Sequence, residues 1–254
     1  MNSVERKDYI LDTLDMKHAV RINELSKELK VTRETIRRDL YTLEDEGRIK
    51  KVHGGAILEN PSGETDYEKR KIENRSEKER IAKTAVSYIE EGDSIYLDYG
   101  TTTLALAQEI VKLKNITVVT NTLPIINTLV KNKAIDILIP GGVLRNNESS
   151  LFGQFALNNI CDIFITIGFF GCSGIDSKAA ITSHHMGEVL ISKQMIQQSQ
   201  TAIVLADQSK FGNIAFNRTA NFEDIDIVVT DQIPTDSHEF DYLNEHGVEL
   251  IASN

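Results

Sequence analysis

Apolar residues at the start of the chain recur at helical spacing in successive runs. The first run predicts a helix that ends near Met16, with apolar positions at Val4, Ile10, Leu11 and Leu14. A second, shorter run around Leu25 and Leu29 predicts a helix of two to three turns, for which Asn23 is the expected cap. These two runs place a small helical unit at the N-terminus.

A third run predicts a longer helix with two chemically distinct faces. It starts after the N-cap residue Thr32, ends near Glu46 before Gly47, and follows the second helix after a link of two residues, which is the spacing of a helix-turn-helix. Its core face carries Ile36, Leu40 and Leu43. Arginine can grip phosphate or guanine, and threonine at a helix start can donate to phosphate. The expected DNA contacts on this helix are Thr32, Arg33, Glu34, Thr35, Arg37, Arg38 and Tyr41.

A basic hairpin is predicted directly after this helix. Polar and apolar residues alternate from 48 to 53, and Gly54 and Gly55 permit a tight reversal before residues 56–58. Such a hairpin would be the wing of a winged helix, with Lys50, Lys51 and His53 against the sugar-phosphate backbone.

From residue 77 the pattern changes to helical runs that alternate with short β-rich runs, which is typical of a doubly wound α/β sheet. The expected helices include 77–89, 102–111, 124–130 and 188–198. The expected buried parallel strands are 94–98, 116–120, 135–139, 162–167, 201–206 and 226–230. Sheets of this kind bind ligands at the carboxyl ends of their strands.

Polar residues and glycines cluster at those strand ends. A turn at Gly100 followed by hydroxyl side chains and a helix start predicts an anion cradle. Basic side chains there could neutralise a phosphate, and Asp and Asn could hydrogen-bond sugar hydroxyls. Gly168 is expected to follow the fourth strand. The other candidate effector contacts are Asp98, Thr101, Thr102, Thr120, Asn121, Gly141, Gly142, Arg145, Asp207 and Lys210.

Two motifs carry a resemblance to the DeoR, or GlpR-type, family of bacterial transcription regulators: Thr-Ile-Arg-Arg-Asp-Leu at 35–40 and His-Gly-Gly-Ala at 53–56. The resemblance extends over about residues 1–231. It implies a C-terminal sensing domain similar in fold to ribose 5-phosphate isomerase, which responds to a phosphorylated sugar and has an acidic residue at a helix start, matched by Glu188. It does not account for His184 and His185.

Length and charge agree with two domains. We expect a winged helix-turn-helix at 1–58, a linker or arm at 59–76 and a sensing domain at 77–254. The segment 67–76 could be an extended arm or a docked helix. Residues 1–56 carry a net charge of +1. Since the whole chain carries −10, the remaining residues carry −11. A near-neutral DNA-binding domain has modest affinity per monomer, so a homodimer or homotetramer is expected.

Several other site classes are not favoured. The chain lacks an apolar stretch long enough for a membrane or a signal peptide, so a cytoplasmic location is expected. Cys161 and Cys172 have no metal or disulfide spacing and are expected to be buried and reduced. His184 and Glu188 would share a helical face if the helix began early, but no third metal ligand is evident. No metal, cofactor or catalytic residue is predicted.

The sequence therefore predicts a DNA-binding repressor of a sugar or sugar-phosphate operon, with operator DNA and a phosphorylated sugar as partners. Two alternatives stay open. One is a sugar-phosphate isomerase or hydrolase with a DNA-binding head, in which a carboxylate near Lys210 would act as base. The other is a winged helix that binds protein rather than DNA.

Overall fold

The computed structural model divides into two compact units, Met1–Thr65 and Asp66–Asn254. It describes residues 2–17, 19–46, 48–52, 54–58, 65, 67–232 and 238–253. Gly47, His53 and the predicted linker at 59–64 lie outside these residues. Within the described part of the chain, no helix is long and apolar enough to cross a membrane.

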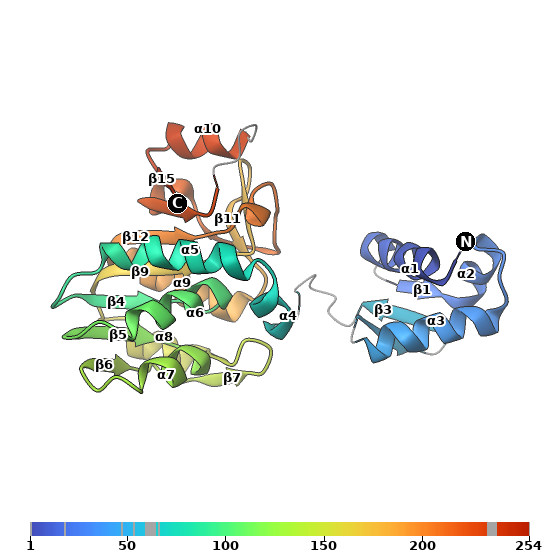
Figure 1. Ribbon diagram of the computed structural model, residues 1–254, viewed down its shortest axis with the longest axis horizontal. Helices are drawn as coiled ribbons and strands as arrows, with labels where there is room; N and C mark the ends of the chain where they lie inside the picture. The colour runs from blue at the N-terminus through green and yellow to red at the C-terminus, as the bar shows by residue number, and fades with distance from the viewer. Residues whose placement is uncertain are drawn as a thin grey trace. The chain divides into compact units, whose positions relative to one another are not determined.

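Three helices and a small antiparallel sheet make up the N-terminal unit (Figure 1). The sheet has the strand order β1-β3-β2. The elements are α1 (Ser3–Lys17), β1 (Ala19–Arg21), α2 (Ile22–Glu28), α3 (Arg33–Asp45), β2 (Ile49–Val52) and β3 (Gly55–Leu58). The helices pack through the apolar positions of the sequence pattern, so Ile10, Leu14, Leu25, Ile36, Leu40 and Leu43 are fully or almost fully buried. This is the predicted winged helix-turn-helix.

Two local details of the N-terminal unit differ from the sequence prediction or add to it. Helix α2 begins at Ile22 with Arg21 at the N-cap position, so Asn23 is not the cap. The chain turns early because residues 19–21 form a strand that pairs with β3. This pairing is close: a Cβ at Gly55 would lie 2.0 Å from the carbonyl oxygen of Val20, so the second glycine of the hairpin is needed for strand contact.

The C-terminal unit is built on a seven-stranded parallel sheet of order β15-β14-β12-β9-β4-β5-β6. The strands are β4 (Ser94–Leu97), β5 (Ile116–Thr120), β6 (Ile135–Leu138), β9 (Ile165–Gly171), β12 (Ser199–Leu205), β14 (Ile227–Thr230) and β15 (Glu249–Ala252). Six of them confirm predicted strands, and β15 was not predicted. Strand β9 extends to Gly171, so Gly168 lies inside it, and a Cβ there would lie 2.4 Å from the Ser199 hydroxyl.

Helices cover both faces of this sheet, which confirms the doubly wound prediction (Figure 1). One face packs against α5 (Arg75–Ala85), α6 (Thr101–Ile110) and α7 (Leu123–Leu129). The other packs against α8 (Gln154–Ile160), α9 (Met186–Gln197) and α10 (His238–Glu245). Side chains alternate between the two cores along each strand, as with Ile95 and Tyr96.

Short elements that the sequence did not predict surround the carboxyl edge of the sheet. They are the hairpin of β7 (Val143–Arg145) and β8 (Ser150–Phe152), and the antiparallel sheet of β10 (Gly174–Asp176), β11 (Ala180–Ser183) and β13 (Asn217–Ala220). The helix α4 (Tyr67–Ile72) is the helical one of the two alternatives that the sequence left open for residues 67–76. Short 3-10 turns complete the unit at η1 (Val86–Tyr88), η2 (Gln208–Lys210) and η3 (Phe222–Asp224). Cys161 is exposed, which contradicts the expectation that both cysteines are buried.

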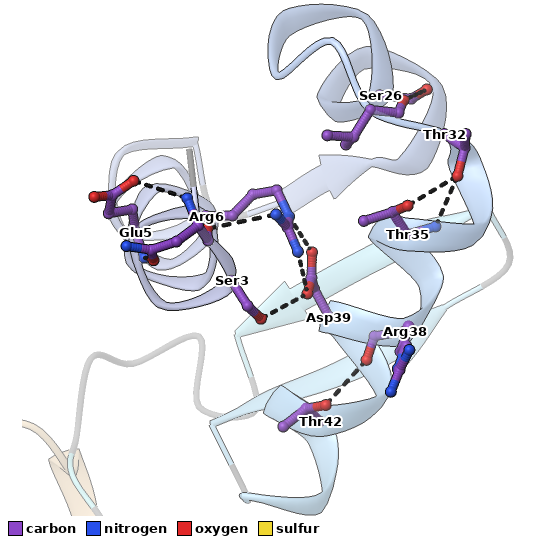
Figure 2. A network of polar contacts seen from close by, with 11 residues as sticks. Ser3, Glu5, Arg6, Ser26, Thr32, Thr35, Arg38, Asp39 and Thr42 are labelled. Atoms are coloured by element: carbon purple, nitrogen blue, oxygen red, sulfur yellow. Dashed lines mark hydrogen bonds and ion pairs between the residues drawn. The ribbon is translucent and has the colours of Figure 1, made fainter.

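A buried ion pair fastens the predicted recognition helix to α1 (Figure 2). The Arg6 guanidinium donates to both carboxylate oxygens of Asp39 over 2.6 and 3.0 Å. The Ser3 hydroxyl lies 3.4 Å from the same carboxylate. The Arg6 and Asp39 side chains are only 11 % and 6 % exposed, so neither charge is well hydrated and each depends on the other for its stabilisation. The pair therefore ties α3 to α1 within the N-terminal unit.

We expect Asp39→Asn to destabilise the N-terminal unit by about 3 kcal/mol, because it leaves the Arg6 charge buried without its partner. Hydrogen exchange of the α3 amides in the full chain measures this loss. Lys7→Met is the control, because Lys7 pairs with the exposed Glu46 and its loss should cost less than about 1 kcal/mol. Equal exchange in both variants would contradict a structural role for the buried pair.

Candidate functional site

The candidate DNA-binding surface is the exposed face of α3. Thr32 caps the helix, since its hydroxyl oxygen accepts from the Thr35 amide over 3.2 Å (Figure 2). Arg33, Glu34, Arg37, Arg38 and Tyr41 are exposed along the helix. Seven residues at the start of the third helix were predicted to contact DNA, and the structure places all of them on one helix and its cap.

Charges on this surface are partly paired. Arg37 lies 3.1 Å from Glu34 one turn earlier, an exposed pair that a phosphate can replace at little cost. The Lys51 ammonium on β2 lies 3.0 Å from Glu44 and 3.0 Å from the centre of the Tyr41 ring. Lys50 precedes Lys51 on the same strand and its side chain is exposed. The hairpin therefore presents Lys50 to solvent and uses Lys51 to hold itself against α3.

The candidate effector site is a pocket at the carboxyl ends of β4, β9 and β12, which we call the strand-end pocket. Five residues predicted from the sequence line it: Gly100, Thr101, Thr102, Asp207 and Lys210. The backbone of Gly100 has φ +123°, which lets the chain turn sharply from β4 into α6. The first turn of α6 thus directs backbone amides to the pocket, the arrangement that binds anions.

Residues that the sequence reasoning did not assign complete the pocket. Arg70 comes from α4, Asn74 from the turn that follows it, Lys78 from α5, and Tyr99 from the loop after β4. Lys78 is only 5 % exposed, and burial lowers the pKa of its ammonium to about 8. The sequence alone could not identify Lys78 as a pocket residue, because its burial depends on the docking of α4.

Asp207 organises one wall of the pocket. Its Oδ1 accepts from the Ser209 amide over 3.0 Å and from the Asn74 side-chain amide over 3.1 Å. Its Oδ2 is buried and has no hydrogen-bond partner among the residues that the structure describes. This oxygen is available to a hydroxyl donor of a bound molecule.

Three more predicted effector residues, Asp98, Thr120 and Asn121, lie in a buried polar cluster rather than on the pocket wall. Asp98 accepts from the Ser192 hydroxyl over 2.9 Å and from Tyr96 over 3.1 Å. Asn121 donates to the Leu151 carbonyl, and Thr120 donates to the Leu97 carbonyl. These side chains tie strand ends to neighbouring elements.

The last four predicted residues lie around the β7–β8 hairpin: Gly141 and Gly142 precede it, Arg145 ends β7, and Glu188 contacts it from α9. Glu188 is fully buried and accepts from both Arg145 and Ser150. Arg145 therefore forms an ion pair with Glu188 and does not line the strand-end pocket. Gly141 and Gly142 form the turn into the hairpin with positive φ, and a Cβ at Gly142 would lie 2.5 Å from the Phe152 carbonyl oxygen.

The two histidines precede α9, which begins at Met186, so His184 and Glu188 do not have helical i,i+4 geometry. The His185 ring packs edge-on against Phe152, with 4.8 Å between ring centres. Its Nδ1 lies 3.7 Å from the Glu188 carboxylate. No group of three or more potential metal ligands occurs among the residues that the structure describes.

Burial raises the pKa of Asp98 from 3.8 to about 7, although hydrogen bonds from Ser192, the Tyr99 amide and Tyr96 act in the opposite direction. The folded state therefore binds this proton more tightly than the unfolded state. The resulting stabilisation is fully present below the unfolded pKa of 3.8 and is lost as the pH rises through about 7.

We expect Asp98→Asn to flatten this pH dependence, because the amide cannot ionise. Denaturant unfolding of the full chain at several pH values measures it. The wild type should lose at least about 1 kcal/mol relative to the variant as the pH rises from below to above the folded pKa, since one pKa unit corresponds to about 1.4 kcal/mol. The exposed Asp136→Asn is the matched control and should follow the wild type. Parallel curves for the wild type and Asp98→Asn would contradict the raised pKa.

Comparison with known protein families gives two adjacent matches. The family model described as the DeoR-like helix-turn-helix domain matches residues 6–62, and the DeoR C terminal sensor domain matches residues 73–232. The two together cover both units of the chain.

Similar proteins of known name are transcriptional regulators. The chain is 38 % identical to the HTH-type transcriptional regulator FruR of Bacillus subtilis, with 99 % of each chain covered. It is 32 % identical to the glycerol-3-phosphate regulon repressor of Escherichia coli, with 98 % of this chain and 99 % of that protein covered. Among solved structures, a D-ribose-5-phosphate isomerase in complex with phospho-erythronic acid aligns with a TM-score of 0.41 and 19 % identity over 54 % of each chain.

Proposed function

The chain belongs to the DeoR family of DNA-binding transcriptional regulators, and from this premise we propose that it represses a sugar or sugar-phosphate utilisation operon and is released from its operator by a phosphorylated sugar. The observation that carries the effector part is the strand-end pocket, where a glycine turn, a helix start and Lys210 converge. Because the proposed partner is operator DNA, the proposed location is the cytoplasm.

DNA recognition is assigned to α3. Its exposed arginines suit the major groove, in which Arg37 and Arg38 contact bases or phosphates, and Lys50 of the wing contacts the backbone. The N-terminal unit alone is close to neutral, so its affinity for phosphates is modest. A homodimer or homotetramer, assembled mainly through the C-terminal units, would place two recognition helices in successive major grooves.

Effector binding is assigned to the strand-end pocket. Phosphate oxygens accept from the first amides of α6 and pair with Lys210, while the unpartnered Asp207 Oδ2 accepts from a hydroxyl. One relative, the glycerol-3-phosphate regulon repressor of Escherichia coli, supports a phosphorylated polyol as the ligand class. A tenfold loss of operator affinity requires that the effector favours the released state by only about 1.4 kcal/mol.

We favour the hypothesis that the pocket binds its ligand without catalysis over that of an isomerase with a DNA-binding head. Such an enzyme needs a carboxylate base within reach of its substrate. Asp98 has a pKa near neutrality, but Ser192 and Tyr96 hold it in the buried cluster and it does not line the strand-end pocket. Asp207 does line the pocket, so the carboxylates alone do not decide between the two functions, and the preference rests on the relatives. The similar proteins of known name are regulators.

We expect Arg37→Ala combined with Arg38→Ala to weaken DNA binding by about tenfold per arginine and to reduce the slope of log affinity against log salt by about 2. Fluorescence anisotropy measures both on a duplex that the wild type has selected from random sequences. Lys131→Ala with Lys133→Ala removes the same charge from exposed positions in the C-terminal unit and should change neither. If the Arg37 and Arg38 variant bound this duplex like the wild type, α3 would not be the helix that reads DNA. If the wild type selected no duplex, the winged helix would be a protein-binding module.

We expect Lys210→Ala to raise the effector concentration needed for DNA release by about tenfold, because one charge-assisted hydrogen bond to phosphate is lost. Affinity for DNA without effector should not change. The measurement is release of the selected duplex by a panel of pentose phosphates, hexose phosphates and glycerol 3-phosphate, and the active compound should be recovered unconverted.

The exposed Lys178→Ala serves as the charge-matched control and should respond like the wild type. An unchanged dose response in the Lys210 variant would remove the strand-end pocket as the effector site. Multiple turnover of any panel compound by the pure protein would favour the enzyme instead.

A further inference from the structure

One wall of the strand-end pocket comes from the first residues of the C-terminal unit. Helix α4 begins at Tyr67, two residues after the last residue of the N-terminal unit. Arg70 of α4, Asn74 of the following turn and Lys78 of α5 all line the pocket. The chain thus leaves the DNA-binding unit and enters the pocket wall within a few residues.

Four contacts hold α4 in the C-terminal unit. The Tyr67 ring is buried in the core beneath α5 and α6. The Arg70 guanidinium pairs with Glu148, whose side chain is fully buried. The Lys78 ammonium donates to the carbonyls of Arg70 and Glu73, the latter over 2.7 Å, and so binds the end of the helix.

The turn after α4 contributes the fourth contact. Asn74 has a left-handed backbone with φ 49°, and its side-chain amide reaches the Asp207 carboxylate over 3.1 Å and the Ser209 hydroxyl over 3.3 Å. Backbone strain at a non-glycine residue persists only where surrounding contacts maintain it. Asn74 therefore fixes the end of α4 to the opposite wall of the pocket.

The cations that fasten α4 also face the pocket. Arg70 and Lys78 make their contacts to Glu148 and to backbone carbonyls while lining the cavity, and no carboxylate ion pair of Lys78 is found in the described part of the chain. A phosphate group is a stronger partner for ammonium and guanidinium than a carbonyl oxygen, and it accepts the arginine fork as well as a carboxylate does. A phosphate in the pocket thus competes directly with the contacts that hold the helix.

We propose that Arg70 and Lys78 bind the phosphate of the effector, and that Arg70 moves from Glu148 to this phosphate, so that α4 changes its packing when the effector binds. The inference rests on the proposed function of the strand-end pocket and adds the route by which occupancy reaches the DNA-binding unit. Because α4 follows that unit along the chain, each effector-induced change in α4 acts on the linker that carries α3. The coupling is reciprocal, so operator binding weakens the affinity for phosphate by the same factor.

The chain has no tryptophan, and Ile72 of α4 is 76 % exposed, so Ile72→Trp introduces a single reporter on this helix. The probes are inorganic phosphate and glycerol 3-phosphate, added to the full chain carrying Ile72→Trp. We expect a saturable change in tryptophan emission with the same midpoint as the Kd from calorimetry. Adding Arg70→Gln should raise that midpoint about tenfold and abolish release of the selected duplex.

Glu148→Gln is the opposite test in the same reporter background. It removes the carboxylate that competes for Arg70 and should lower the midpoint about tenfold. Arg70→Lys keeps the charge without the fork and should give a partial loss, which keeps the test valid if Glu148→Gln folds poorly. Lys71→Gln is the matched control, because Lys71 is an exposed neighbour on α4 that pairs with Glu68, and it should behave like the wild type.

The outcomes separate this inference from the proposed function. If neither probe binds, the phosphate role of Arg70 and Lys78 falls, and the effector assignment of the pocket falls with it. If a probe binds and releases DNA but leaves the emission at position 72 and the response of Arg70→Gln unchanged, only the α4 coupling is overturned.

Discussion

Buried carboxylates determine how the elements around the strand-end pocket are arranged. Asp98, Glu148 and Glu188 are all fully or almost fully buried in the C-terminal unit. A charge removed from water must be hydrogen-bonded or paired, and the loss of a partner is more costly than the gain from the pair. Their partners come from α9, α4 and β7: Ser192, Arg70 and Arg145. Arg70 lines the pocket, whereas Ser192 and Arg145 join α9 and β7 to buried carboxylates that do not line it.

Local patterns in the sequence were sufficient for much of this architecture. Thr32 at the start of α3 and Gly100 before α6 were recognised because a cap and a turn glycine depend on neighbouring residues. Strand β15 and the β7–β8 hairpin were not recognised. Strands of three or four residues are too short to show alternation. Gly168 was misplaced because its need for glycine arises from Ser199 and Phe170, which only the folded sheet brings close.

Long-range pairings explain why the candidate site was predicted only in part. Arg70 and Glu148 are 78 residues apart, and Asp98 and Ser192 are 94 residues apart. No periodicity connects such positions, so Arg145, a basic residue in a strand-end loop, was expected together with Lys210 to face the phosphate. The structure places Arg145 on Glu188 and brings Arg70 and Lys78 to the pocket. Residue type and local position were enough to identify the strand-end loops. Which cations face the pocket depends on long-range ion pairs such as Arg145–Glu188.

Net charge makes these pocket cations more important. Residues beyond 56 carry −11, so a phosphorylated ligand approaches an acidic unit and is repelled over about a Debye length, about 8 Å at physiological salt. Attraction must come from cations in the pocket itself, where burial already lowers the pKa of Lys78 to about 8. A bound anion reverses that shift, because it favours the charged ammonium. In the proposed scheme, a bound phosphate thus supplies the counter-charge that backbone carbonyls give Lys78 only weakly, so that ligand binding and the packing of α4 depend on the same cations.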